Sequence, residues 1–176
     1  MSEFDEAGSG QNWTDVEEKP QTAPVEPPRG FFTAHVDDKG RLKLPVNFQA
    51  YLNGIDDSGV FVTSTDGRIA KIYPNSVWNG NLKVLEDLNA QDPGAAEAIS
   101  FMANHFGADG KVDAQGRVTL PTDLRRALAL ENQEVRVDCS QGGVNIYSMA
   151  EYEARKREAE AKMAENLRAA KLKGFK

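Results

Sequence analysis

The chain has 176 residues, of which 40% are hydrophobic and 27% charged, and its formal net charge is −6. This length suits one domain or two small ones with an adequate core. Its apolar runs fall far short of the roughly 20 residues that a membrane helix needs. The N-terminus lacks the basic region and following apolar segment that would predict a secretory signal. The single cysteine, Cys139, excludes an internal disulfide framework and fits a reducing compartment, so we expect a cytoplasmic protein without a membrane partner.

Charge is distributed unevenly along the chain. Residues 1–29 hold seven acidic and two basic residues. Residues 30–148 hold fifteen acidic and eleven basic residues, and residues 149–176 hold five acidic and eight basic residues. An acidic central region is a poor non-specific partner for a polyanion, because sequence-independent DNA affinity comes mainly from phosphate neutralisation. Any DNA binding must therefore use a local basic surface.

Residues 1–29 are rich in Gly, Ser, Gln, Glu and Pro and contain few large apolar residues. This composition predicts a disordered acidic arm, with ordered structure starting near residue 30. Trp13 is either an unpacked aromatic residue of this arm or a docking residue.

A ten-residue segment occurs twice. Residues 36–45 read V-D-D-K-G-R-L-K-L-P, and residues 112–121 read V-D-A-Q-G-R-V-T-L-P, an offset of 76. An Asp followed three residues later by Gly suits a tight turn, in which the carboxylate bonds local amides and Gly takes a positive φ. The pattern predicts turns ordered by Asp37 with Gly40 and by Asp113 with Gly116.

A short strand follows each turn. Alternation places Leu42 and Leu44 on the core face, with Arg41 and Lys43 on the other. In the second copy, Val118 and Leu120 face the core and Arg117 and Thr119 face outward. Pro45 and Pro121 then suit the first turns of short helices, expected at residues 46–52 and 122–128.

Two more strands complete each unit. In the first, a strand at 60–65 is joined through Asp66 and Gly67 to a returning strand at 68–73. In the second, strands at 134–139 and 144–147 flank a turn at 141–143. The repeat unit is therefore about 45 residues long.

Helices follow each unit. Residues 74–76 are expected to cap a helix with Trp78, Leu82, Leu85 and Leu88 on one face, and a second helix begins at Pro93 and ends at Gly107. These form a helical hairpin between the halves. The last helix starts with the capping-box pattern S-M-A-E at residues 148–151 and extends to about residue 172. Its thin apolar stripe leaves two interpretations, a solvated helix or one that packs against a neighbouring subunit.

Neither half can close a sheet alone, because four short strands leave open edges and little core. Two copies can pair about a pseudo-twofold axis and close one barrel. We therefore expect an α+β fold with these parts: an acidic arm at 1–29; one barrel domain at 30–148, made of a first repeat (30–74), a helical linker (75–107) and a second repeat (108–148); and a C-terminal helix at 149–176.

The second copy, extended through T-D-L-R-R at residues 122–126, resembles the DNA-binding segment of AbrB/SpoVT-type regulators. The duplication, the helical hairpin between the copies and the Phe31-Phe32 start resemble the MraZ family. This resemblance covers about residues 30–150. It implies a swapped-hairpin β-barrel, a ring-shaped homo-oligomer, and a nucleoid-associated regulator of division and cell-wall genes, acting as a repressor at repeated promoter motifs.

Carried over residue by residue, the resemblance places an Asp-x-x-x-Arg pair in each turn, Asp37 with Arg41 and Asp113 with Arg117. The Asp would order the turn while the Arg meets a phosphate or a guanine edge. The flanking DNA contacts would be Lys39, Lys43, Arg125 and Arg126. The alternative for Arg41 and Arg117 is a purely structural salt bridge in the turn. The sequence departs from the family where Gln49 stands at a position that often holds arginine, and in its long acidic arm.

The rival function is a protein-interaction barrel, antitoxin-like or a scaffold. Enzymatic functions are disfavoured, because no P-loop or nucleophile elbow occurs in the sequence. His35 and His105 lack the spacing of zinc ligands. We therefore expect no catalytic residue, no metal, no cofactor and no small-molecule substrate. The family resemblance implies double-stranded promoter DNA as the partner.

Overall fold

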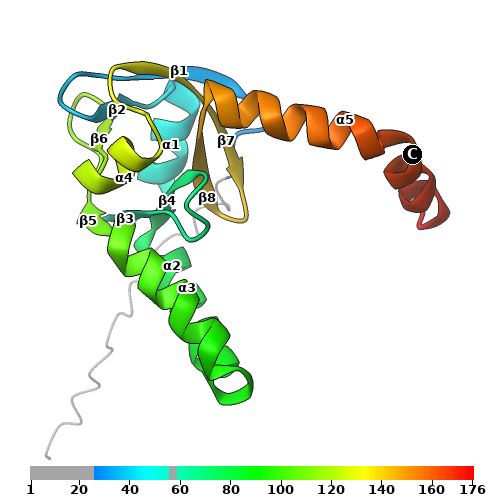
Figure 1. Cartoon of the computed structure of the whole chain (residues 1–176). Coiled ribbons are helices and arrows are strands. Elements are labelled where there is room, and N and C mark those ends of the chain that lie inside the picture. Colours follow the sequence, from blue (N-terminus) through cyan, green and yellow to red (C-terminus); the bar gives the residue numbers. More distant parts are fainter. Residues whose placement is uncertain (1–25, 56–58) are drawn as a thin grey trace, which may run out of the picture.

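Two copies of the same strand, turn, strand and helix order build a nearly closed antiparallel barrel, from which three longer helices extend (Figure 1). The computed structural model describes residues 26–55 and 59–176, so most of the predicted acidic arm lies outside the described residues. The elements are β1 (Phe32–Val36), β2 (Arg41–Lys43), α1 (Val46–Gly54), β3 (Val60–Thr63), β4 (Ala70–Pro74), α2 (Asn75–Gln91), α3 (Pro93–Phe106), β5 (Ala108–Gly110), β6 (Arg117–Thr119), α4 (Thr122–Ala127), β7 (Gln133–Ser140), β8 (Gly143–Ser148) and α5 (Met149–Leu172).

The strand order is β5-β3-β4-β8-β7-β1-β2-β6, and every pairing is antiparallel. The first strand of each repeat pairs with the third strand of the other repeat, β1 with β7 and β5 with β3. The pairs β4–β8 and β2–β6 join equivalent strands of the two halves. The predicted swapped-hairpin barrel is therefore confirmed, and each half completes the other's sheet.

The barrel interior is filled by equivalent residues from both repeats. Leu42 and Val118 are fully buried at the centres of β2 and β6, as the alternation predicted. Phe48 on α1 and Leu124 on α4 are buried in the same core. Burying a side chain of this size contributes about 1.5–3 kcal/mol to stability. The two short helices are therefore stabilised by packing on the outside of the barrel rather than by their intrinsic helix propensity.

The turn between β3 and β4 is longer than the sequence predicted. The predicted strands ended at residue 65 and restarted at 68, but β3 ends at Thr63 and β4 begins at Ala70. The reason is a local hydrogen-bond set: the Asp66 carboxylate accepts the amides of Arg68 and Ile69, and the Ser64 hydroxyl accepts that of Gly67. These amides serve the turn instead of the ladder.

The predicted helical hairpin between the repeats is present as α2 and α3, which extend together from the barrel (Figure 1). The predicted capping of α2 by residues 74–76 is only partly right. The N-cap is Pro74, as predicted. The Asn75 amide, however, finds its acceptor outside the predicted segment, because it donates to the Gly59 carbonyl at 3.2 Å. The apolar face of α2 is half-buried or exposed, with Trp78 stacked on Phe61 at 4.5 Å between ring centroids. Within the described residues, no helix is long and apolar enough to cross a membrane.

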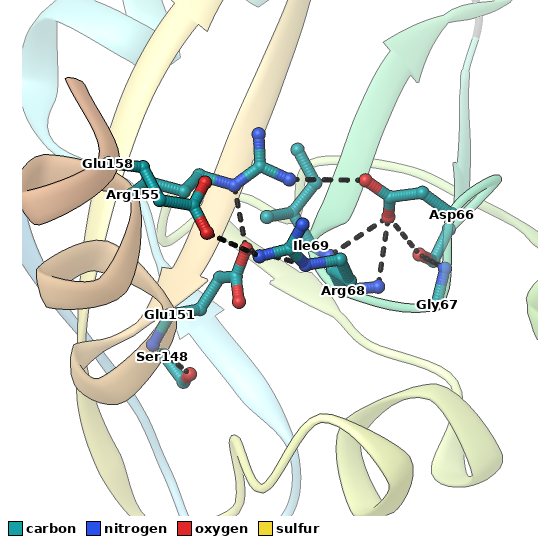
Figure 2. A network of polar contacts seen from close by, with 9 residues as sticks. Asp66, Gly67, Arg68, Ile69, Ser148, Glu151, Arg155 and Glu158 are labelled. Atoms are coloured by element: carbon teal, nitrogen blue, oxygen red, sulfur yellow. Dashed lines mark hydrogen bonds and ion pairs between the residues drawn. The ribbon is translucent and has the colours of Figure 1, made fainter. Parts of the chain in front are cut away.

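The last helix, α5, leaves the barrel in a different direction from the hairpin (Figure 1). Its predicted cap is confirmed, since the Ser148 hydroxyl accepts the Glu151 amide at 3.2 Å. Figure 2 shows how its first turns are tied to the β3–β4 turn: Arg155 contacts Asp66 at 3.3 Å and Glu151 at 2.7 Å, and Arg68 contacts Glu151 at 3.2 Å. Partly exposed pairs add little stability, about 0–1 kcal/mol each, so their main effect is to fix where α5 points.

Candidate nucleic-acid interface

The two repeated turns have the same geometry. In the first, one oxygen of the Asp37 carboxylate accepts the amides of Lys39 and Arg41 at 3.0 and 2.8 Å, and the other accepts Nε of Arg41 at 2.7 Å. Gly40 has a φ of +75°, which L side chains adopt only with strain. The turn chemistry predicted from the D-x-x-G spacing is therefore present.

The second turn repeats these contacts. The Asp113 carboxylate accepts the amides of Gln115 and Arg117, both at 2.9 Å, and Nε of Arg117 at 2.8 Å. Gly116 has a φ of +72°. In each turn, the hydrogen bond from the arginine's own backbone amide is the main cause that lowers the pKa of the aspartate. Both carboxylates are thus anionic at neutral pH and hold their arginines in a fixed direction.

The strands that follow the turns lie side by side. In the β2–β6 ladder, Arg41 is opposite Thr119 and Lys43 is opposite Arg117. Because Leu42 and Val118 point into the core, these four side chains share the outer face. We call the outer face of β2 and β6, together with Lys39 in the first turn, the basic ribbon. It joins basic residues from the two repeats into one surface.

The basic ribbon places like charges next to each other. Lys43 and Arg117 face each other across the strands, an arrangement that is unfavourable without a compensating group. The Arg117 guanidinium is compensated by Asp113 at 2.8 Å, and the Lys43 ammonium donates to the Gln115 carbonyl of the second turn. An anion bound on this face would interact favourably with both cations.

The two arginines of α4 occupy different environments. Arg126 is exposed, with 67% of its side chain accessible, and its Nε lies 3.6 Å from Glu131. Arg125 has only 15% of its side chain accessible; it donates from Nε to Glu131 at 2.8 Å and from Nη1 to the Leu120 carbonyl at 3.0 Å. Arg126 can reach a ligand from the surface, whereas Arg125 is already held inside the protein.

Sequence reasoning missed two residues near these turns. Gln49 packs over the second turn, although the sequence marked this position only as a missing arginine. Lys111 lines a groove of about 410 Å³ beside the second turn, together with Arg117 and Thr122. The sequence signal that could have indicated Lys111 is its position directly before the second repeated segment. The equivalent position in the first repeat is His35.

Neither histidine points to a metal site. His35 is exposed on β1, opposite Glu134 of β7. His105 lies on α3, between Phe101 and Phe106. Among residues 26–55 and 59–176, no group of three His, Cys, Asp or Glu side chains could hold a metal ion.

The swapped barrel and its paired Asp-x-x-x-Arg turns define a duplicated barrel protein of the AbrB-like class. Residues 108–173 match the model of the family described as "MraZ protein, putative antitoxin-like". The chain is 36% identical over 133 residues to the transcriptional regulator MraZ of Acidobacterium capsulatum, covering 75% of this chain and 87% of that protein.

Two further relatives bear the same name. The protein of a Marinomonas species is 33% identical over 130 residues, covering 73% of this chain and 84% of the relative. That of Syntrophotalea carbinolica is 29% identical over 150 residues, covering 84% and 98%. The chain therefore belongs to the MraZ family of transcriptional regulators, and the predicted family is confirmed.

Proposed function

We propose that this protein binds double-stranded promoter DNA in a sequence-specific way through the basic ribbon. The observation that carries the proposal is the β2–β6 pairing, which places Arg41, Lys43 and Arg117 on one outer face. Arginine matches phosphate or the guanine edge by paired hydrogen bonds, and lysine supplies a point charge. Lys39 and Arg126 extend the same contacts from the first turn and from α4.

The turns prepare the arginines for this role. Each guanidinium is already oriented by its aspartate, so less side-chain freedom is lost when DNA binds. A salt bridge in the turn and a DNA contact are therefore compatible roles for the same arginine. Some 27–31% of each arginine side chain stays accessible to a ligand.

Assembly offsets the small number of basic residues in one chain. We propose a ring-shaped homo-oligomer whose repeated ribbons engage repeated promoter motifs, because linked weak sites gain effective concentration without new contacts. In the cytoplasm, this oligomer would be a nucleoid-associated repressor of division and cell-wall genes. The relatives' name supports a role in transcriptional regulation, and the family resemblance is the basis for proposing the ring, the repression and the target genes.

The experiment is fluorescence anisotropy on labelled promoter DNA that carries the repeated motif, compared with a scrambled duplex of the same length and composition. We expect tighter binding to the repeat-bearing DNA, with affinity falling linearly on a logarithmic salt scale. Equal binding to the two duplexes would contradict a sequence-specific regulator.

A second candidate function is suggested by the antitoxin-like description of the family. In that case the same turns would hold a protein instead of DNA. Salt dependence separates the two, because counterion release from a duplex gives a steep slope that a protein partner does not need to show. Absence of salt-dependent DNA binding would favour the protein-interaction role.

A further inference from the structure

Each repeat places a helix side chain over the turn of the other repeat. Gln49 on α1 and Arg125 on α4 stand at equivalent positions, 76 residues apart. Arg125, from the second repeat, packs over Gly40 of the first turn, and Gln49, from the first repeat, packs over Gly116 of the second turn. The two DNA-facing turns are thus supported crosswise.

Arg125 fits closely against the first turn. A Cβ added at Gly40 would lie 2.6 Å from both Cδ and Nη1 of Arg125, so the glycine is needed for this approach. The Arg125 guanidinium also holds the Leu120 carbonyl at 3.0 Å. The Leu120 amide in turn donates to the Gly40 carbonyl at 2.8 Å, which closes a chain of contacts from α4 to the first turn.

Gln49 makes the corresponding contacts in the other half. Its amide nitrogen donates to the Leu44 carbonyl at 2.6 Å, and the Leu44 amide donates to the Gly116 carbonyl at 3.0 Å. The two supports differ in their charge and in one side-chain partner. Arg125 is paired with Glu131, whereas Ile55 stands at the position equivalent to Glu131.

From this crosswise packing we infer that Arg125 is a positioning residue for the first DNA-binding turn and not a phosphate contact. Its guanidinium is paired with Glu131, donates to the Leu120 carbonyl and packs over Gly40, and 15% of its side chain is accessible. A neutral glutamine, Gln49, packs over the second turn in the same way. The positive charge of Arg125 is therefore not what the site requires. Only the part of this inference that is tested by DNA affinity rests on the proposed function.

The test compares Arg125→Gln, which installs the residue of the other repeat, with Arg125→Ala, which removes the support. Gln49→Ala is the matched control for the second turn. For each variant, circular dichroism verifies folding, and anisotropy measures affinity and salt slope on repeat-bearing DNA. Native-state hydrogen exchange on the free protein measures protection of the turn amides of Gly40 and Gly116.

We expect Arg125→Ala to raise exchange at Gly40 but not at Gly116, and Gln49→Ala to do the reverse. General destabilisation would raise both together. Arg125→Ala should weaken DNA binding by about three- to tenfold, in line with one lost supporting contact. Arg125→Gln should keep the wild-type salt slope and stay within about threefold of wild-type affinity.

A phosphate contact gives a different result. Arg125→Gln would then lower the magnitude of the salt slope by about 0.9, as Arg125→Ala would, and the exchange of Gly40 would not change. That outcome would overturn the inference. If the wild-type protein shows no salt-dependent DNA binding, the proposed function fails, while the crosswise exchange pattern still supports or overturns the positioning role.

Discussion

Replacing Gly116 by alanine tests the contact between the repeats through stability. Gly116 has a φ of +72°, and an alanine in this left-handed region costs about 1–2 kcal/mol. A Cβ would also overlap the Gln49 amide, so that side chain must move and lose its bond to the Leu44 carbonyl. A lost hydrogen bond costs about 0.5–1.5 kcal/mol. Together these two effects should lower the free energy of unfolding of the variant by about 1.5–3.5 kcal/mol.

The assay is urea unfolding at one fixed protein concentration, because the proposed assembly would make stability depend on concentration. Gly30→Ala is the control for the backbone term alone, since Gly30 has a φ of +91° and a Cβ there would meet open space in the described structure. Adding Gln49→Ala to Gly116→Ala removes the overlap, so the double variant should lose less than the sum of the single losses. Additivity within about 0.5 kcal/mol would refute the contact.

Three further predictions concern acid stability, the free thiol and the base of α5. Because the aspartate pKa values are lowered from 3.8, the Asp37 and Asp113 carboxylates stabilise the fold above about pH 4, and this stabilisation is lost as the pH falls below 3.8. The double variant Asp37→Asn with Asp113→Asn should thus show a shallower acid loss of the urea midpoint, and an unchanged curve would contradict this origin. Burial raises the pKa of Cys139 from 9.0 to about 11, so its alkylation at pH 8 should be at least about tenfold slower than in urea-unfolded protein; equal rates would place the thiol in water. Arg155→Ala should cost less than about 1 kcal/mol but speed hydrogen exchange in the first turns of α5, while Lys156→Ala should not.

Most of the barrel could be predicted because its signals are local or repeated. The D-x-x-G spacing specifies a turn whatever surrounds it, and Asp37 and Asp113 make the predicted bonds to local amides. The alternation around Leu42 specifies which side chains point inward. The duplication then predicts the long-range pairing, because equivalent strand edges that neither repeat can satisfy alone can pair with each other.

The remaining features depend on contacts between segments far apart in sequence. Gln49 and Arg125 are ordinary surface-type residues in their helices, and only the swapped pairing places each over the other repeat's glycine. The link between Asp66 and Arg155 is likewise a meeting of distant segments that no spacing rule anticipates. For the same reason the sequence could mark Arg125 and Arg126 as basic but could not show that Arg125 is already engaged.

The salt dependence of DNA affinity in the Arg41→Ala and Arg117→Ala double variant tests the basic ribbon most directly. Each lost phosphate contact lowers the magnitude of the logarithmic salt slope by about 0.9, so the double variant should lose up to about 1.8 together with affinity. Lys83→Ala, on α2 and outside the ribbon, should keep the wild-type values. A folded double variant with wild-type affinity and slope would contradict DNA binding through this surface.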